Sequence, residues 1–399
     1  MVATTGTEPY FDPYDVEINA DPYPAYARLR EEAPAYYNDR YDFWALSRHA
    51  DVEEALKRWQ VFSNTRSDIL EIIQSGLDLP PGVVMFEDPP LHTMHRGLMA
   101  RVFSPKRMNE FEDQVRAYCR ACLDPLVGTD RFDFVADLGE EMPMRVIGML
   151  LGIPETDQEM VRTKQDARLR TEAGKPMALK QDAIADGSMF ADYIDWRAEH
   201  PSDDLMTTLL HAEFEDERGA KRTLSREEVL TYTQVIAGAG NETTGRLIGW
   251  LGKVLGDHPD QRRLLVEDRS LIPNTIEETL RFQPTGPHIA RYVARDADYH
   301  GTTVPAGSAM LLLVGSANRD ERRWTDPDRF DIRRDEGAHL TFGFGTHFCL
   351  GAALARLEGR VALDEVLTRF PDWEVDEANI EMASTSTVRG WKSMPVFVG

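Results

Sequence analysis

The stretch FGFGTHFCLG, residues 342–351, places three glycines, one histidine and one cysteine within ten positions. An apolar pattern of helical spacing begins directly after it, within residues 352–369. Glycine allows backbone conformations and close approaches that other residues resist, and the N-terminal end of a helix stabilises negative charge. The stretch therefore predicts a glycine-rich turn that presents Cys349 at the beginning of a helix.

Composition limits the class of protein. The chain has 399 residues, 42% apolar and 28% charged, with a net charge of −23. A chain this acidic is a poor candidate for sequence-general binding of nucleic acid. Its first residues lack the basic and apolar pattern of a signal peptide, and no run approaches the roughly 18 apolar residues that cross a bilayer. We expect a soluble, cytoplasmic protein with no membrane span and no nucleic-acid partner.

The other two cysteines, Cys119 and Cys122, form a C-x-x-C pair. This spacing is also found in redox and metal sites. Here the pair lies well inside the helical pattern FEDQVRAYCRACLDPL, away from the N-terminal turn that lowers a thiol pKa. No second Cys or His pair lies nearby in the sequence to complete a zinc site. We expect ordinary thiols that are buried or half-buried.

The pattern of the whole chain is mainly helical. A short helix is expected at 21–33 and a strand at 41–47, within a β-containing N-terminal part of about residues 1–65. Helical periodicity dominates about 90–285, short strands follow at about 291–315, and a helix and strands end the chain at 352–399. Residues 199–205 and 215–222 read as surface loops. We expect one domain, residues 1–399, mainly α with a small β part.

Residues 225–256 predict one long helix with an unusual middle. Ser225 and Glu228 form a capping box, and the helix would run for about 45 Å. Its centre, AGAGNETTG (237–245), contains glycines, which cost roughly 1 kcal/mol each in a helix interior. It also contains a carboxylate and two hydroxyls where a core helix should be apolar. Because local rules tend to fail at functional sites, we expect the glycines to admit a flat, bulky group beside Glu242 and Thr243.

Two further groups of charged residues stand out. Glu278 and Arg281 share a helix face, and we expect Arg329 to join them in a buried structural network. Residues 89–108 contain no acid at all, and His92 and Arg96 lie on one helical face within them. This basic run is either a solvated helix face or a site for anionic groups or an acidic partner.

Together these residues resemble the cytochrome P450 family of heme-thiolate monooxygenases. The heme-binding loop F-G-x-G-x-H-x-C-x-G is matched at Phe342, Gly343, Gly345, His347, Cys349 and Gly351. The oxygen-helix motif A-G-x-[DE]-T is matched at Ala239, Gly240, Glu242 and Thr243. The motifs E-x-x-R, D-R-F and H-x-x-x-R are matched at Glu278 and Arg281, at Asp328, Arg329 and Phe330, and at His92 and Arg96. The resemblance covers nearly the whole chain in the family's order.

The resemblance implies a single heme domain, with a long central helix that crosses the molecule. It implies heme b, with the Cys349 thiolate as axial ligand of the iron, stabilised by backbone N–H groups and the following helix. It implies that Glu242 and Thr243 deliver protons during the activation of O2. Heme contacts are implied for the propionate-binding residues His92, Arg96, Arg291 and His347, and for Ala239, Gly240, Phe342, Gly343 and Gly351.

Electrons must then come from a partner, since no flavin domain follows the heme region. The resemblance implies a ferredoxin and a ferredoxin reductase that uses NAD(P)H. An acidic ferredoxin would fit a docking face formed by the basic residues Arg101, Lys106, Arg107, Arg356 and Arg360.

The expected substrate is an apolar small molecule, such as a lipid, a terpenoid or a steroid-like compound, that is hydroxylated or epoxidised. The segments that would line its pocket are mostly apolar, with Thr285 and His288 as polar anchors. The pocket residues implied are Val84, Val235, Ala239, Thr243, Thr285, His288, Ile289, Thr387 and Val388.

Three alternatives remain at this stage. A heme-thiolate enzyme that uses peroxide, or rearranges a bound substrate, often lacks the acid–threonine pair, which this chain keeps. A heme-based sensor or carrier of a diatomic gas would need neither proton delivery nor an electron partner. A structural thiol is the usual role of a lone buried cysteine, but the matching neighbours of Cys349 favour a ligand.

Overall fold

The computed structural model describes residues 8–399 apart from 78, 80–82, 101, 180–186 and 217. Its α-helices are α1 Val16–Ala20, α2 Tyr23–Glu32, α3 His49–Lys57, α4 Leu70–Ser75, α5 Leu91–Ala100, α6 Pro105–Asn109, α7 Glu112–Leu123, α8 Met142–Leu151, α9 Glu155–Leu169, α10 Ala191–Glu199, α11 Leu205–His211, α12 Arg226–Asp257, α13 Pro259–Glu267, α14 Ile272–Phe282, α15 Val314–Ala317 and α16 Ala352–Arg369. Its strands are β1 Ala35–Asn38, β2 Phe43–Leu46, β3 Phe62–Ser63, β4 Arg131–Asp133, β5 Glu213–Glu215, β6 Lys221–Thr223, β7 Ile289–Val293, β8 Ala297–Tyr299, β9 Thr302–Val304, β10 Ala309–Leu312, β11 Trp373–Val375, β12 Glu381–Met382, β13 Trp391–Ser393 and β14 Pro395–Val398. The predicted class, mainly α with a small β part, is confirmed.

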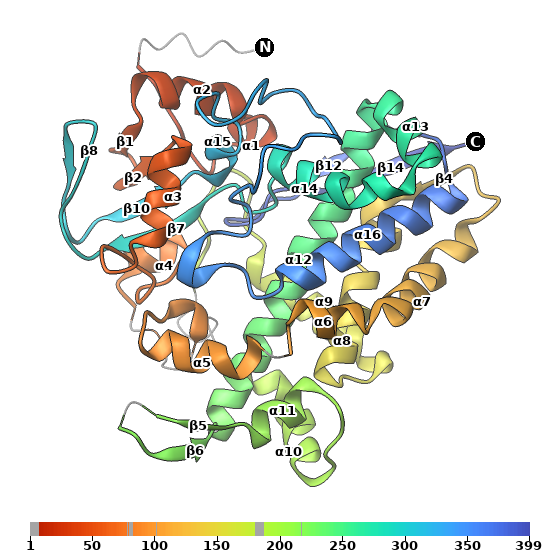
Figure 1. Cartoon of the computed structure of the whole chain (residues 1–399), viewed down its shortest axis with the longest axis horizontal. Coiled ribbons are helices and arrows are strands. Elements are labelled where there is room, and N and C mark those ends of the chain that lie inside the picture. The colour runs from red at the N-terminus through yellow and green to blue at the C-terminus, as the bar shows by residue number, and fades with distance from the viewer. Residues whose placement is uncertain (1–7, 78, 80–82, 101, 180–186, 217) are drawn as a thin grey trace.

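The largest sheet combines strands from the N-terminal part of the chain with strands from residues 289–312. Its strand order is β1-β2-β10-β7-β3, with β10 parallel to β2 and the other neighbours antiparallel. The sheet and helices α1–α4 form one side of the molecule, and the larger helical part forms the other (Figure 1). Of the strands predicted at 41–47 and 291–315, β2, β7 and β10 therefore belong to one sheet, whereas β8 and β9 form a separate two-stranded sheet. The surface loop expected at 215–222 is partly wrong, because β5 and β6 pair there as an antiparallel hairpin.

The long helix α12 is the axis of the helical part. It begins after Ser225, whose side chain accepts from the Glu228 N–H while the Glu228 carboxylate accepts from the Ser225 N–H, so the predicted capping box is confirmed. Figure 1 shows α12 crossing the molecule, with α8 and α16 beside it. Apolar side chains of these helices form the main core. The predicted long central helix is confirmed.

Two glycines of α12 lie close to neighbouring protein. A Cβ on Gly240 would lie 2.4 Å from Ile147 Cδ1 of α8, and one on Gly245 would lie 2.5 Å from the carbonyl oxygen of Gly139. Because the Gly139 backbone cannot move aside as the tip of a side chain can, Gly245 needs glycine for close packing. The expectation that the glycines of this helix admit a flat group stays a prediction.

Helix α16 buries a carboxyl group. Glu358 has no exposed surface, and both of its carboxyl oxygens lack a hydrogen-bond partner among the described residues. Burial raises the pKa of Glu358 well above its usual value, so the protonated form is favoured in the fold. The carboxyl must therefore take up or keep a proton on folding.

Glu358→Gln is expected to stabilise the protein increasingly as pH rises. Below the unfolded-state pKa, Glu358 is protonated in both states and has no effect on the pH dependence of stability. Above it, only the unfolded state ionises, so the free energy of unfolding of the wild type falls by about 1.4 kcal/mol per pH unit until the folded-state pKa is reached. The isosteric amide does not titrate. Urea unfolding should show a larger difference in unfolding free energy between variant and wild type at pH 7.5 than at pH 5. A difference that is equal at both pH values would contradict this prediction.

Candidate active site

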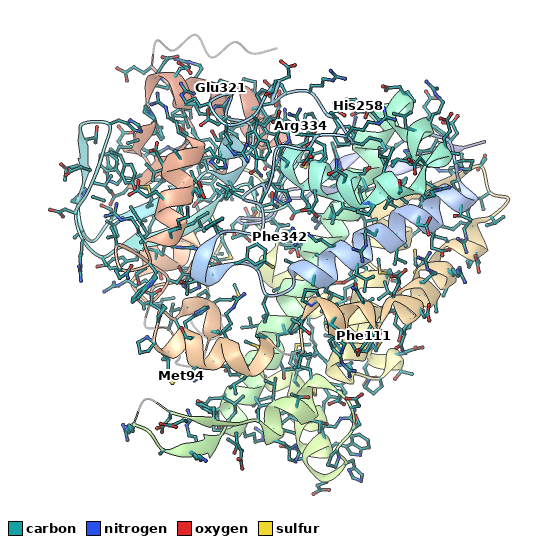
Figure 2. The ribbon with its side chains drawn as sticks, viewed as in Figure 1. Met94, Phe111, His258, Glu321, Arg334 and Phe342 are labelled. Atoms are coloured by element: carbon teal, nitrogen blue, oxygen red, sulfur yellow. The ribbon has the colours of Figure 1, made fainter. Side chains whose placement is uncertain are left out.

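The loop before α16 folds as a closed turn around Cys349. The Cys349 N–H donates to the Phe342 carbonyl at 2.7 Å, and the Gly343 N–H donates to the Leu340 carbonyl at 2.8 Å. Gly343 and Gly345 both have φ of 71°, in the left-handed region that favours glycine. Figure 2 shows Phe342 on this loop, just before α16. The turn brings the sulfur of Cys349 to the N-terminal end of α16, which begins after Gly351.

The surroundings of the Cys349 thiol act on its pKa in opposite directions. Burial raises its pKa, while N–H groups of Gly351 and Ala352 and the charges of Arg96 and Arg356 act to lower it. The residue still has accessible surface. An exposed thiol that two N–H groups approach and two cations flank is suited to be a thiolate ligand once a metal adds its own charge.

Helix α5 and the cysteine loop bring cationic groups together. The rings of His92 and His347 lie with centroids 4.2 Å apart, and Arg96 donates to the Phe348 carbonyl. Burial, followed by the charges of His347 and Arg96, lowers the pKa of His92 to about 4. His92 Nδ1 is buried with no hydrogen-bond partner among the described residues. These groups form a site where an anion would be stabilised.

Arg291, on β7, adds a further buried cation. It is 3% exposed, and its Nη1 donates to the Ala290 carbonyl at 2.7 Å. Burial lowers the pKa of Arg291 to about 10, and Asp68 and Asp88 oppose this shift. Asp88 also lies 3.5 Å from His347 Nε2. Asp68 and Asp88 were missed by sequence reasoning, because no motif or spacing links them to residues more than 200 positions away.

One face of α12 is open in the middle of the buried helix. Val235, Ala239 and Thr243 are spaced four apart and share this face, and none of the three is fully buried. Thr243 Oγ1 donates to the Ala239 carbonyl at 2.9 Å. Because the hydroxyl hydrogen is used in this way, the oxygen presents its lone pairs to the site.

Glu242 is held by an arginine that the motif does not contain. Its Oε1 lies 3.0 Å from Arg246 Nη2, one turn further along α12, and both side chains are largely buried. Arg246 also donates to the Trp391 carbonyl at the beginning of β13. The acid of the acid–threonine pair is therefore tied to a fixed positive charge, which favours the carboxylate form.

The buried network around Glu278 has a different third member from the one expected. Arg281 Nε and Arg334 Nε lie 2.7 and 3.2 Å from the carboxylate, and all three side chains are buried. The prediction for Arg329 is wrong. Its side chain is 66% exposed near Asp331, and only its carbonyl joins the network, as an acceptor from Arg281 and Arg334. A turn begins at Asp326, whose φ is 44°. The N–H of Arg329 donates to the Asp326 carbonyl and closes this turn.

Comparison with known proteins identifies the family. The family model described as cytochrome P450 matches residues 180–393 of the chain. The putative cytochrome P450 123 of Mycobacterium bovis is 39% identical over 392 residues, which cover 97% of this chain and 96% of that protein. This chain belongs to the cytochrome P450 family.

Two further P450s give the range of similarity. Vitamin D(3) 25-hydroxylase of Pseudonocardia autotrophica is 36% identical, with 100% of this chain and 98% of that protein covered. A solved structure of a mutant of P450 EryK in complex with erythromycin B is 31% identical and has a TM-score of 0.85, over 95% of this chain and 96% of that chain. The fold is therefore the P450 fold, and the protein is a P450 monooxygenase of the EC 1.14 class. The family implies heme and O2, with reducing equivalents from redox partners.

The described residues fit a heme. The accessible Cys349 thiol suits an iron ligand. Buried or half-buried donors for anionic groups such as heme carboxylates come from His92, Arg96, Arg291 and His347. The open face with Ala239 and Thr243 lies on α12. This helix packs against α16, the helix that follows Cys349, and Gly359 of α16 lies close to Leu247 of α12.

The predicted pocket residues lie in separate segments that the fold brings close. His288 Nε2 lies 3.2 Å from the Ser386 carbonyl, so the segment before β7 contacts the hairpin between β12 and β13. The Arg389 N–H donates to the Thr285 carbonyl at 2.7 Å. Val84, Thr285 and Val388 are buried, and the partly exposed members of the predicted pocket here are His288, Ile289 and Thr387.

The C-x-x-C pair has the properties of ordinary thiols. Cys119 is buried and Cys122 half-buried in α7, and all three cysteines of the P450 are free. Burial raises the pKa of Cys119, and it raises the pKa of Cys122 to about 11. Among the described residues, no group of three or more His, Cys, Asp or Glu is placed to hold a metal ion. Neither thiol is activated for redox chemistry.

Proposed function

We propose that this P450 hydroxylates or epoxidises an apolar lipid, terpenoid or steroid-like molecule, using heme b, O2 and electrons from a ferredoxin. One juxtaposition carries the proposal. An accessible cysteine lies at the beginning of α16, and an acid–threonine pair lies on α12, the helix packed against it. A gas sensor or carrier needs no such pair, and a structural thiol needs no flanking cations.

Each residue would have a distinct role. Heme supplies the activation of O2 when bound. Cys349 would hold the iron as thiolate. The propionates would accept hydrogen bonds from the side-chain nitrogens of His92, Arg96, Arg291 and His347. Thr243 Oγ1, with its hydrogen directed to Ala239, would accept and position a proton on the substrate side, and Glu242 would exchange protons with the interior of the protein.

The substrate class rests on two supports. The open face of α12 is formed by apolar side chains and one hydroxyl, which suits an apolar ligand with few polar groups. The named relative that acts on vitamin D(3) and the solved P450 that binds erythromycin B both take bulky, largely apolar molecules. We therefore place bulky polycyclic or macrocyclic compounds first among the candidates.

Reconstitution tests the proposal. The purified protein, a ferredoxin, its reductase and NAD(P)H should convert a member of a lipid, terpenoid and steroid panel to a product that contains one oxygen atom from labelled O2. Conversion should stop when the ferredoxin is left out. Conversion by peroxide alone, at the rate of the full system, would favour the peroxide-using alternative.

Two of the basic residues expected in the ferredoxin-docking face already form ion pairs within the protein. Arg107 lies 3.0 Å from Glu110 and from Asp203, and Arg356 lies 2.7 Å from Glu277, so both charges are already compensated. Within the part of the chain that the structure describes, Lys106 and Arg360 carry no ion pair. Arg101 lies outside the described residues. We place the docking contact on Arg360 and Lys106.

Arg360→Glu should slow reduction by an acidic ferredoxin about tenfold at low salt, because rim charges act mainly on the rate of association. Arg107→Glu should have a smaller effect. Arg295→Glu, between β7 and β8, is the control and should change the rate less than twofold. Stopped-flow reduction under carbon monoxide measures all three. A rate for Arg360→Glu equal to wild type would remove Arg360 from the contact.

We further propose that the enzyme is one heme domain, residues 1–399, that works in the cytoplasm. The three free cysteines suit a reducing compartment. No helix among the described residues has the length and apolar character to cross a membrane.

A further inference from the structure

A small polar cavity lies beside the predicted substrate pocket. It is formed where the N-terminal segment, the turn before α4 and the hairpin between β12 and β13 meet, and its volume is about 10 Å³. Its polar lining includes Tyr14, Asp68, Glu71, His288 and Thr387. This volume suits one water molecule or one hydroxyl group. Two of these residues, His288 and Thr387, were already expected in the pocket.

The tautomer of His288 is fixed by its surroundings. Nε2 lies 3.2 Å from the Ser386 carbonyl, which only accepts hydrogen bonds, so Nε2 must carry the hydrogen. Burial lowers the pKa of His288 to about 4, so the ring is neutral at physiological pH. Nδ1 is then an acceptor, and it is buried with no partner among the described residues.

Asp68 supplies a second unsatisfied oxygen to the same cavity. Its Oδ1 is buried with no hydrogen-bond partner among the described residues. Its position is firmly set, because the Ala290 N–H donates to the Asp68 carbonyl at 2.9 Å and the preceding Ser67 has a φ of 92°. A non-glycine residue in the left-handed region is uncommon and is often found at functional sites.

Glu71, the second acid of the cavity, already has partners. Glu71 Oε1 accepts the Met177 N–H at 3.0 Å, and the Glu71 carboxylate also hydrogen-bonds the Tyr14 hydroxyl. Burial raises the pKa of Asp68, and the charge of Arg291 opposes this shift. Asp68 Oδ1 and His288 Nδ1 both lack a hydrogen-bond donor among the described residues. A buried acceptor without a donor is costly, so a ligand that supplies one gains affinity.

We propose that this cavity is a subsite for one hydroxyl group of the substrate, which donates to Asp68 Oδ1 or His288 Nδ1. The inference rests on the proposed function, since it assumes that the adjoining pocket holds the substrate. It narrows the substrate class to molecules with a hydroxyl at one end of an apolar body. A ketone at the same position has no hydrogen to donate, and a carboxylate would meet Asp68 and Glu71.

The test compares matched hydroxy and keto compounds. Pairs that differ only in that group, on steroid, terpenoid and straight-chain scaffolds, are titrated into the ferric holoenzyme while its spin state is followed. For the pair that binds, the hydroxy compound should bind at least tenfold more tightly. His288→Phe, which keeps an aromatic ring but removes the acceptor, should reduce the ratio to below threefold, and Asp68→Leu should reduce it as well. Ile69→Val changes an apolar residue that lines the same cavity and should keep the wild-type ratio.

Equal binding of both partners by the wild type would overturn the subsite and leave a cavity for a structural water only. The proposed oxidation of an apolar substrate would stand in that case, because binding itself was observed. A ratio that survives in both His288→Phe and Asp68→Leu would also overturn it. Failure of every pair to bind would overturn the subsite together with the proposed substrate class, while the carbon monoxide spectrum would still report the heme-thiolate centre.

Discussion

Cys349→Ser is expected to abolish the strongly red-shifted Soret band of the reduced, carbon monoxide-bound protein and to reduce substrate oxidation below detection. The N–H groups of Gly351 and Ala352 and the charges of Arg96 and Arg356 surround this one sulfur and support its negative charge. A serine oxygen at the same place is a far weaker acid than a thiol and gives no sulfur ligand. The absorption spectrum and a turnover assay check the two expectations.

Cys122→Ser is the matched control for this change. Cys122 is half-buried in α7, and burial raises the pKa of its thiol, so it is not suited to bind metal as a thiolate. The variant should keep the wild-type spectrum and turnover. A Cys349→Ser protein that retained the red-shifted band would contradict the assignment of Cys349 as ligand.

Arg334→Met is expected to lower the free energy of unfolding by about 3 kcal/mol, because breaking one member of a buried charge network leaves polar partners unsatisfied. Arg334, labelled in Figure 2, has a buried side chain. It donates to the Glu278 carboxylate at 3.2 Å and to three backbone carbonyls, those of residues 325, 326 and 329. All of these acceptors lose a donor together.

Arg329→Met provides the control, since Arg329 belongs to the sequence motif but points to solvent. Its guanidinium is 3.9 Å from Asp331 and its side chain is 66% exposed. An exposed pair at this distance contributes little, so the variant should lose less than about 0.5 kcal/mol. Chemical denaturation of both variants measures the contrast. Equal losses, or a larger loss for Arg329→Met, would show that the network is not held by Arg334.

The features predicted correctly are those encoded by residues close together in the chain. The capping box of α12 needs only Ser225 and Glu228, and the turn around Cys349 needs glycines that tolerate φ of 71°. The pairing of Glu278 with Arg281 follows from the 3.6-residue period of a helix. Motifs of this kind identified the family and the long central helix before any contact was known.

The sequence by itself determined the P450 fold, the cysteine loop and the acid–threonine pair. Only the tertiary structure decided that Arg334 replaces Arg329 and that Asp68 faces the cavity of His288. It also showed that Gly240 and Gly245 lie close to α8 and to Gly139. The physical reason is that these features depend on which way side chains point and on segments up to about 220 residues apart, which the spacing of a motif does not encode.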